Sequence, residues 1–143
     1  MKQKKLSFVA ILSLLLFATN LLISEVKNEE LLQAYNTLKK AGEYEKKKKA
    51  LEVFAKNYNN EKVISMLVDL LMYNYDNPDF KENDQVAFYD DVIAEEIIKI
   101  LTKSGHPSAF PALLRYVLYN KRHRDATVNA AWKAIKNIDW NLK

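Results

Sequence analysis

Apolar residues from Glu29 onward recur at intervals of three and four positions, and no stretch alternates apolar and polar residues with a period of two. Spacings of three and four place apolar side chains on one face of an α-helix. The pattern therefore predicts an all-α protein of six helices in three pairs. The predicted helices cover residues 29–41, 44–57, 61–74, 87–104, a fifth helix that starts near 107, and 125–138.

Glycine and proline mark the expected helix ends. Gly42 and Gly105 follow the first and fourth helices, where glycine is the usual stop residue. Pro107 suits the first turn of the fifth helix, because the N–H that proline lacks would be unpaired there. Pro111 lies one turn further on and is expected to bend that helix or to delay its start. Asp125 is the predicted N-cap of the sixth helix.

An internal repeat is the most informative feature of the sequence. The second helices of the three pairs share the pattern apolar, apolar, charged, apolar, apolar, at residues 50–54, 97–101 and 131–135. The first helices align in the same order, at residues 31–33, 66–68 and 113–115. The repeat predicts a short α-solenoid of three stacked antiparallel helix pairs with one shared core. An ordinary helical bundle is the alternative.

The last pair resembles a HEAT-type repeat. Residues 105–114, GHPSAFPALL, are similar to the small turn, proline and apolar first helix of that family, and residues 125–135, DATVNAAWKAI, to its second helix. The similarity is best over 105–138, although Asn129 stands where the family usually has arginine. Residues 34–54 weakly resemble a tetratricopeptide unit through their Gly-Glu-Tyr-Glu segment. Both resemblances imply a helix-pair solenoid that provides a binding surface, and neither implies a reaction.

The N-terminal segment differs from the rest of the chain. Three lysines within residues 1–5 precede a run from Leu6 to Ser24 without a charged side chain. This order is typical of a secretory signal, and the apolar run approaches the ~20 residues that span a bilayer. Residues 1–24 are therefore expected to be a cleaved signal peptide or an uncleaved anchor at 6–23. A buried core helix of a cytosolic protein is a third, less favoured interpretation.

Export is the consequence of either favoured interpretation. Residues 25–143 then form a single helical-repeat domain in the periplasm or on the outer face of the cytoplasmic membrane. The net charge of +4 comes mostly from the three N-terminal lysines, since 19 basic and 18 acidic groups remain after residue 24. This near balance argues against a nucleic-acid partner, as does the excess of lysine over arginine.

A long loop is predicted between the third and fourth helices. Aligned positions of the first and second helix lie 31 residues apart in the middle pair, from 66 to 97, against 19 and 18 residues in the other two pairs. The extra residues fall at about 74–88, and such loops tend to be functional or disordered. The acidic residues do not have the spacing of a calcium-binding loop, and the glycine that such a loop needs for its turn is missing. A calcium site is therefore disfavoured. The loop is either a solvated variable segment or a contact for a partner protein, with these candidate residues: Tyr75, Asp76, Asp79, Phe80, Glu82, Asp84 and Phe88.

Several charged clusters remain. Four successive lysines at 46–49 point all round a helix and are expected to form a solvated surface, with contact to an acidic partner or a lipid headgroup as the alternative. Lys121, Arg122 and Arg124 lie in a turn, which is either simply polar or docks on an anionic surface. The acid pairs at 90–91 and 95–96 are expected on the helix surface, because adjacent helical residues diverge by about 100° and cannot share a proton.

Catalytic and cofactor chemistry has few candidates in this chain. There is no cysteine, and the two histidines lie in turns without a serine–histidine–acid pattern. We therefore expect no metal, no cofactor and no enzyme activity. The favoured function is a scaffold or adaptor that binds another envelope protein. The alternative is a membrane-anchored protein that binds anionic lipid or wall polymer through its basic turns; a hydrolase of envelope glycans or peptides, with Glu95 or Glu96 as its acid, is more remote.

Overall fold

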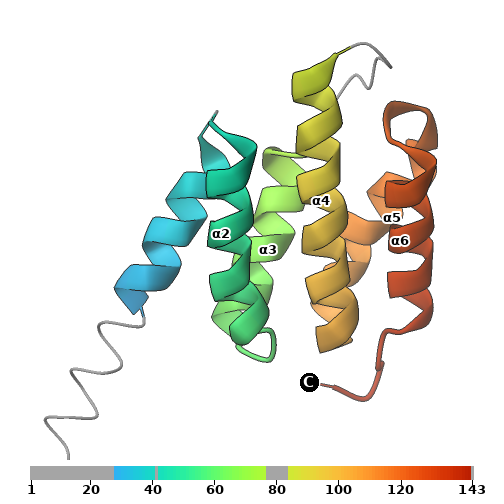
Figure 1. Cartoon of the computed structure of the whole chain (residues 1–143). Helices are drawn as coiled ribbons and strands as arrows, with labels where there is room; N and C mark the ends of the chain where they lie inside the picture. The colour runs from blue at the N-terminus through green and yellow to red at the C-terminus, as the bar shows by residue number, and fades with distance from the viewer. Residues whose placement is uncertain (1–27, 41, 77–83, 143) are drawn as a thin grey trace, which may run out of the picture. The chain divides into compact units, whose positions relative to one another are not determined.

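A computed structural model describes residues 28–40, 42–76 and 84–142, and these residues form helices and turns without a β-strand. Residues 28–39 are helical, and five further α-helices follow (Figure 1). Their bounds are α2 Tyr44–Lys56, α3 Glu61–Tyr73, α4 Gln85–Ser104, α5 Phe110–Leu118 and α6 Asp125–Lys136. Two short 3-10 helices, η1 Pro107–Ala109 and η2 Asn120–Arg122, lie on either side of α5.

The chain divides into two compact units, residues 1–32 and 33–143. Of the first unit the structure describes only residues 28–32, which are helical. The signal peptide or anchor predicted at 1–24 lies outside the described residues and stays a prediction, as does a single domain over 25–143. Among the residues that are described, no helix is long and apolar enough to cross a membrane.

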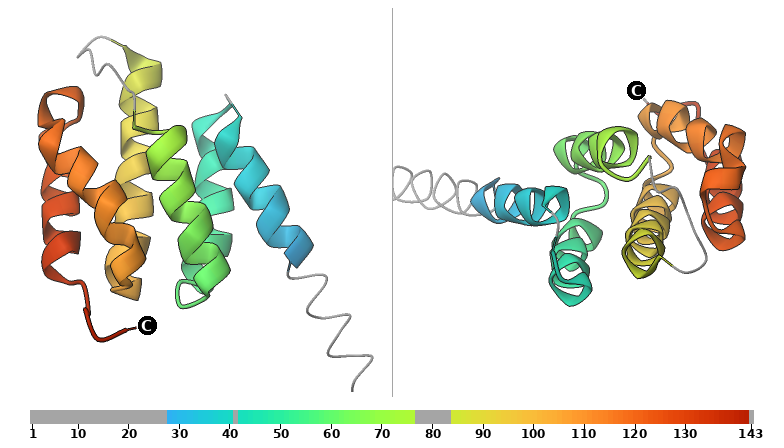
Figure 2. Two further views of the ribbon diagram at one scale, coloured as in Figure 1. Left: turned by 180° about the vertical axis from the view of Figure 1, so that it is seen from behind. Right: turned by 90° about the horizontal axis from the view of Figure 1, so that it is seen from above.

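The second unit consists of two layers of helices (Figure 2). In one layer α4 packs between α2 and α6, and these three helices run in the same direction. In the other layer α3 packs against α5 and η1. Between the layers α3 contacts α4, and α5 contacts α6. The all-α fold with six helices packed as neighbouring pairs is therefore confirmed.

The core follows the predicted helical periodicity. At the first position of the repeated five-residue pattern, Ala50, Ile97 and Ala131 are all buried. The last pair departs from the first two at the second position, where Trp132 is 49% exposed. Complete burial of a large aliphatic side chain contributes about 1.5–3 kcal/mol. The large side chains that are fully buried include Phe54, Leu67, Leu70, Leu71, Ile93, Ile97 and Ile98.

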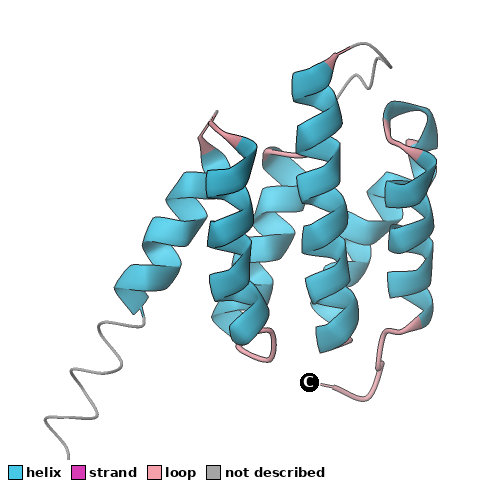
Figure 3. Cartoon of the chain, in the orientation of Figure 1, coloured by secondary structure: helices cyan, strands magenta, loops and turns pink. Residues whose placement is uncertain are grey.

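Short turns join α2 to α3 and α4 to η1 (Figure 3), and polar side chains cap the starts of α3 and α4. Asn60 caps α3 by accepting a hydrogen bond from the backbone N–H of Lys62 at 2.9 Å. Asp84 caps α4 by accepting from the N–H groups of Val86 and Ala87. These caps satisfy donors that have no partner within the helix.

Prolines determine how the fifth helix begins. Pro107 opens the 3-10 turn η1, and Pro111 occupies the first turn of α5, so the α-helix starts only at Phe110. The delayed start predicted from Pro111 is confirmed. The predicted N-cap of α6 is wrong, because Asp125 is already the first helical residue and Arg124 holds the cap position.

Gly105 has a backbone conformation that other residues rarely adopt. Its φ angle is 64°, and its carbonyl oxygen accepts a hydrogen bond from the N–H of Asp139 at 2.9 Å. A Cβ atom at this position would lie 3.2 Å from the backbone oxygen of Asn137. The end of α4 and the C-terminal segment after α6 therefore meet at a glycine that cannot be replaced without strain.

Gly105→Ala is expected to lower the free energy of unfolding by about 1–2 kcal/mol, because of its left-handed conformation and the close contact. Gly42→Ala is the matched control, since a Cβ there lies 4.0 Å from its nearest neighbour and the φ angle is not left-handed. Urea titration followed by circular dichroism measures both changes. Equal stability of the two variants would contradict this account of Gly105.

Candidate functional site

An extended surface hollow lies between α2 and α4. This groove has a volume of about 430 Å³ and is open to solvent. Apolar, aromatic and charged side chains line it together: Tyr44, Lys48, Leu51, Glu52 and Ala55 from α2, and Glu96 and Ile100 from α4. We call these residues the α2–α4 groove.

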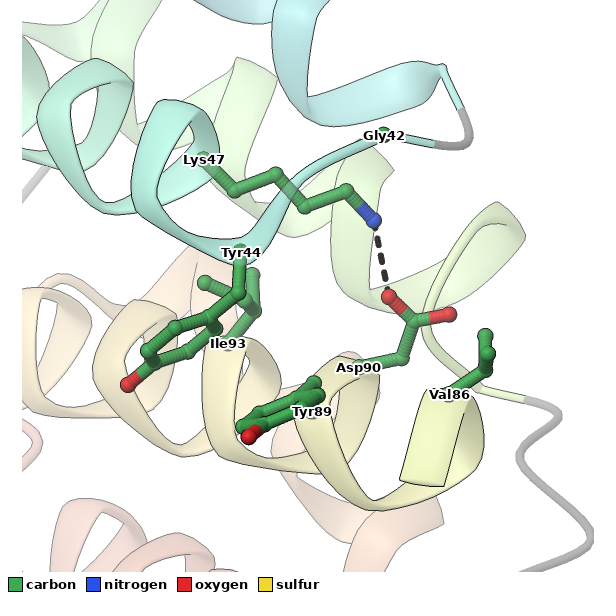
Figure 4. Close-up of a pocket in the computed structure, with 7 residues that line it drawn as sticks. All are labelled: Gly42, Tyr44, Lys47, Val86, Tyr89, Asp90 and Ile93. Atoms are coloured by element: carbon green, nitrogen blue, oxygen red, sulfur yellow. Dashed lines mark hydrogen bonds and ion pairs between the residues drawn. The ribbon is translucent and has the colours of Figure 1, made fainter. Parts of the chain in front are cut away.

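A smaller pocket of about 70 Å³ adjoins the groove at the N-terminal ends of the two helices (Figure 4). Tyr44 lines both hollows, and its ring stacks on that of Tyr89 with 4.8 Å between ring centres. The ring of Phe88 meets Tyr89 edge-on at 5.7 Å. Val86 and Tyr89 are 71% and 36% exposed, so this end of the groove presents an aromatic and apolar surface to solvent.

An ion pair between a buried lysine and a partly exposed aspartate closes the inner side of the small pocket (Figure 4). The Nζ atom of Lys47 lies 2.7 Å from Oδ1 of Asp90 and 5.1 Å from the centre of the Tyr75 ring. The Lys47 side chain is only 7% exposed, and a charge at such a site requires a partner. The predicted solvated surface at 46–49 is therefore wrong at Lys47, because one of four successive lysines has to face the neighbouring helix.

A second buried polar cluster joins α4 to α6. Asp91 is completely buried, and its Oδ1 lies 2.8 Å from Nδ1 of His123. Its Oδ2 accepts hydrogen bonds from the hydroxyl of Thr127 at 2.6 Å and from the backbone N–H of Arg124 at 3.0 Å. Asp91 thus supplies to the start of α6 the capping bond that no side chain at its own N-cap makes.

The surface position predicted for Asp91 is wrong, and the reason lies in the packing of α4. This helix has α2 on one side and α6 on the other. Adjacent residues diverge by about 100° around a helix, so Asp90 faces Lys47 of α2 while Asp91 faces α6. Glu95 and Glu96, the other acid pair, are both partly exposed, in agreement with the prediction.

The Asp91 cluster has the residue types of an acid–base pair but not the arrangement. Because a carboxylate only accepts hydrogen bonds, Nδ1 of His123 is the donor, and the imidazole stacks on the Tyr116 ring at 4.2 Å. Nε2 of His123 is buried and has no hydrogen-bond partner among the described residues. The Thr127 hydroxyl bonds to Asp91 and not to the imidazole. The cluster holds α4 and α6 together and presents no reacting atom to solvent.

The loop residues predicted to contact a partner do not share one exposed surface in the structure. Tyr75 and Asp76 are buried: the Tyr75 hydroxyl donates to the Leu38 carbonyl oxygen at 2.7 Å, and Asp76 pairs with Arg115. Asp84 is the N-cap of α4. Phe88 is 38% exposed and is the one of the four that belongs to the aromatic end of the groove.

The remaining predicted loop residues, Asp79, Phe80 and Glu82, lie outside the described residues, and their part in a partner contact stays a prediction.

The three basic residues predicted to dock on an anionic surface differ in how they are placed. Lys121 and Arg122 are exposed in η2, and the Arg122 guanidinium lies over the Tyr119 ring at 5.3 Å.

Arg124, the third residue predicted for an anionic surface, is engaged within the protein. Its guanidinium pairs with Glu95 at 3.2 Å and lies 4.8 Å from the centre of the Phe88 ring. The contact also links the start of α6 to the aromatic end of α4. Only Lys121 and Arg122 are therefore left exposed to an anionic surface.

The sequence prediction missed the groove, although the two helices carry a matched signal. The α2 residues 44, 48, 51 and 55 follow one helix face at spacings of four, three and four, and Glu96 and Ile100 on α4 lie at the matching spacing of four. Periodicity alone does not state which helices lie side by side, so the two rows could not be placed together.

Comparison with known proteins assigns no family or activity. No protein-family model, no curated protein and no solved structure matches the chain. Within residues 28–40, 42–76 and 84–142, no three metal-binding side chains are grouped to hold an ion. The groove and the buried polar contacts are therefore the features of the chain that bear on its function.

Asp91→Ala is expected to lower the free energy of unfolding by about 3 kcal/mol, because it leaves His123, Thr127 and the start of α6 without their shared acceptor. Glu96→Ala is the control on the same helix; its pair with Lys99 is half-exposed, and we expect a loss below about 1 kcal/mol. Chemical denaturation measures both. A loss for Asp91→Ala no larger than for the control would show that the buried cluster does not join the helices.

A second prediction concerns alkaline pH. Burial, followed by the charge of Asp90, raises the pKa of Tyr75 above its ordinary 10.0, and burial also raises the pKa of Tyr116. Their hydroxyls lose protons in the unfolded state first, so stability is complete below about pH 10 and falls as the pH rises further. The Tyr75→Phe/Tyr116→Phe double variant is expected to lose less stability over that range.

The measurement is chemical denaturation at a series of pH values, with tyrosinate absorbance recorded in parallel. The double variant removes two buried hydrogen bonds and starts about 2 kcal/mol less stable at neutral pH. For each protein, the quantity compared is therefore the slope of the free energy of unfolding against pH above pH 10. Identical slopes would contradict the assignment of Tyr75 and Tyr116 as the groups that ionise on unfolding.

Proposed function

We propose that this protein is an exported, non-catalytic helical-repeat module that binds another envelope protein through the α2–α4 groove. The resemblance of residues 105–138 to a HEAT-type repeat supports this proposal, together with the two-layered packing of the helices. Stacked helix pairs provide extended surfaces, and such surfaces commonly bind other proteins.

The observation that carries the proposal is the open groove itself. Small-molecule sites are concave and enclose most of their ligand. The α2–α4 groove is open along two parallel helices and combines aliphatic, aromatic and charged side chains. This lining suits a segment of a protein, which makes its main contacts with apolar side chains and is oriented by a few charges.

Export is supported by the lysines and uncharged apolar run of residues 1–24. The absence of catalysis in the proposal is supported by the burial of the Asp91–His123 pair, the only acid–histidine contact among the described residues. The proposal therefore places the module in the periplasm or on the outer face of the cytoplasmic membrane, as a scaffold or adaptor.

The test is an in-cell crosslinked pull-down of the tagged full chain, read by mass spectrometry. We expect a Tyr44→Ala/Tyr89→Ala variant to recover the partner at least about tenfold less well, because aromatic anchors dominate such contacts. Tyr73→Ala is the control, since Tyr73 is 77% exposed on α3 and lies outside the groove. Circular dichroism confirms that both variants fold.

A third variant separates the groove from the loop. Replacing residues 77–83 with a Gly/Ser linker of equal length keeps Asp76 and Asp84, which have structural contacts. If this variant loses the partner and Tyr44→Ala/Tyr89→Ala keeps it, the loop and not the groove is the contact. Recovery of the same partner with all variants would overturn the proposal.

A further inference from the structure

The lining of the groove indicates the kind of segment that it binds. We infer that the α2–α4 groove takes an amphipathic helix of the partner whose central basic side chain lies between Glu52 and Glu96. This inference rests on the proposed function, because it names the chemistry of the partner at the same site.

Side chains from both helices shape the groove. On α2 the row is Tyr44, Lys48, Leu51 and Ala55, and the last two have counterparts 45 residues later in Glu96 and Ile100 on α4. Tyr89, the counterpart of Tyr44, stacks on it at the adjoining small pocket. The helices run in the same direction, and the twelve residues from 44 to 55 make the α2 wall of the groove about 16 Å long. Three turns of a third helix fit such a groove by packing ridges between the rows.

The charged side chains of the groove lining differ in whether they already have a partner within the protein. The Glu52 side chain makes no ion pair or hydrogen bond with any residue in the described part of the chain, whereas Lys48 pairs with Glu45 at 3.8 Å and lies 5.5 Å from the Tyr44 ring centre. Glu96 pairs with Lys99 at the groove edge but remains 43% exposed. An incoming ammonium or guanidinium therefore meets an available carboxylate, whereas an incoming carboxylate meets no unpaired cation of the lining.

The apolar contacts set the order of side chains along the bound helix. At one end the stacked rings of Tyr44 and Tyr89, beside exposed Val86, suit a bulky apolar side chain. At the other end Ala55 and Ile100 leave an apolar surface with a small residue on one wall. The face of the partner helix that enters the groove is therefore expected to carry a bulky apolar, a basic and an apolar residue, in that order and at intervals of three or four residues.

The first experiment identifies the segment bound by the full chain in cells. A photoreactive phenylalanine analogue replaces Ala55 in the groove, or Ser65 on the exposed side of α3 as control. Mass spectrometry of the crosslinked peptide is expected to give an amphipathic sequence with a lysine or arginine near its middle, from Ala55 only. No protein crosslink from Ala55 would overturn the proposed function and this inference together.

Other crosslinks overturn this inference alone. An acidic segment or a segment without helical periodicity leaves the groove a protein-binding site of different chemistry. A second copy of this chain shows self-association instead, and a lipid adduct shows membrane contact.

The second experiment measures the role of the two carboxylates. The crosslinked segment is synthesised, and its binding to the full chain is followed by fluorescence anisotropy. Glu52→Gln/Glu96→Gln is expected to weaken binding about tenfold. Glu61→Gln, an exposed acid at the start of α3, is expected to leave it unchanged. A peptide with its central basic residue replaced by glutamine should bind wild type and double variant equally; an undiminished affinity of the basic peptide for the double variant would refute the inference.

Discussion

The arrangement of the second unit depends on the position of α4 between two helices of its own layer. A helix in this position packs against a neighbour on each side. The consecutive residues Asp90 and Asp91 each bind one of these two neighbours. Asp90 accepts from buried Lys47 of α2, and Asp91 accepts from the turn and the first residues of α6. Each carboxylate is at once a charge that needs partners and the group that fixes the position of a neighbouring helix.

The same constraint produces the groove. Lys47 and Asp90 hold the N-terminal ends of α2 and α4 together, and the Tyr44 and Tyr89 rings stack just outside this pair. Beyond the stacked rings the side chains between the helices are shorter or charged, and the groove opens there. The proposed binding surface is thus a consequence of how α2 is attached to α4.

Sequence periodicity predicted the helices well, because burial of one apolar face determines the spacing of residues within each element. It also predicted the late start of α5 from Pro111, a local effect of the proline ring. It failed at Lys47 and Asp91, whose burial depends on which helices become neighbours. A lysine or an aspartate on a helix is normally solvated, so only the tertiary contacts show which member of a charged run is buried.

The candidate site was harder to predict than the fold for the same reason. The extra length between α3 and α4 directed attention to the loop, yet Tyr75 and Asp76 at its start are bound inside the protein. The groove residues carry a signal only when α2 and α4 are known to lie side by side. Their individual residue types are ordinary for solvated helix surfaces.

Native-state hydrogen exchange of the full chain tests the central role of α4 most directly. If α4 holds its layer together, the slowest amides of α2, α4 and α6 should exchange through one common unfolding event with the same free energy. In Asp91→Ala, protection should fall first in α6, which loses its cap. Protection of α6 that is independent of α4, and unchanged by removal of the Asp91 carboxylate, would contradict the account.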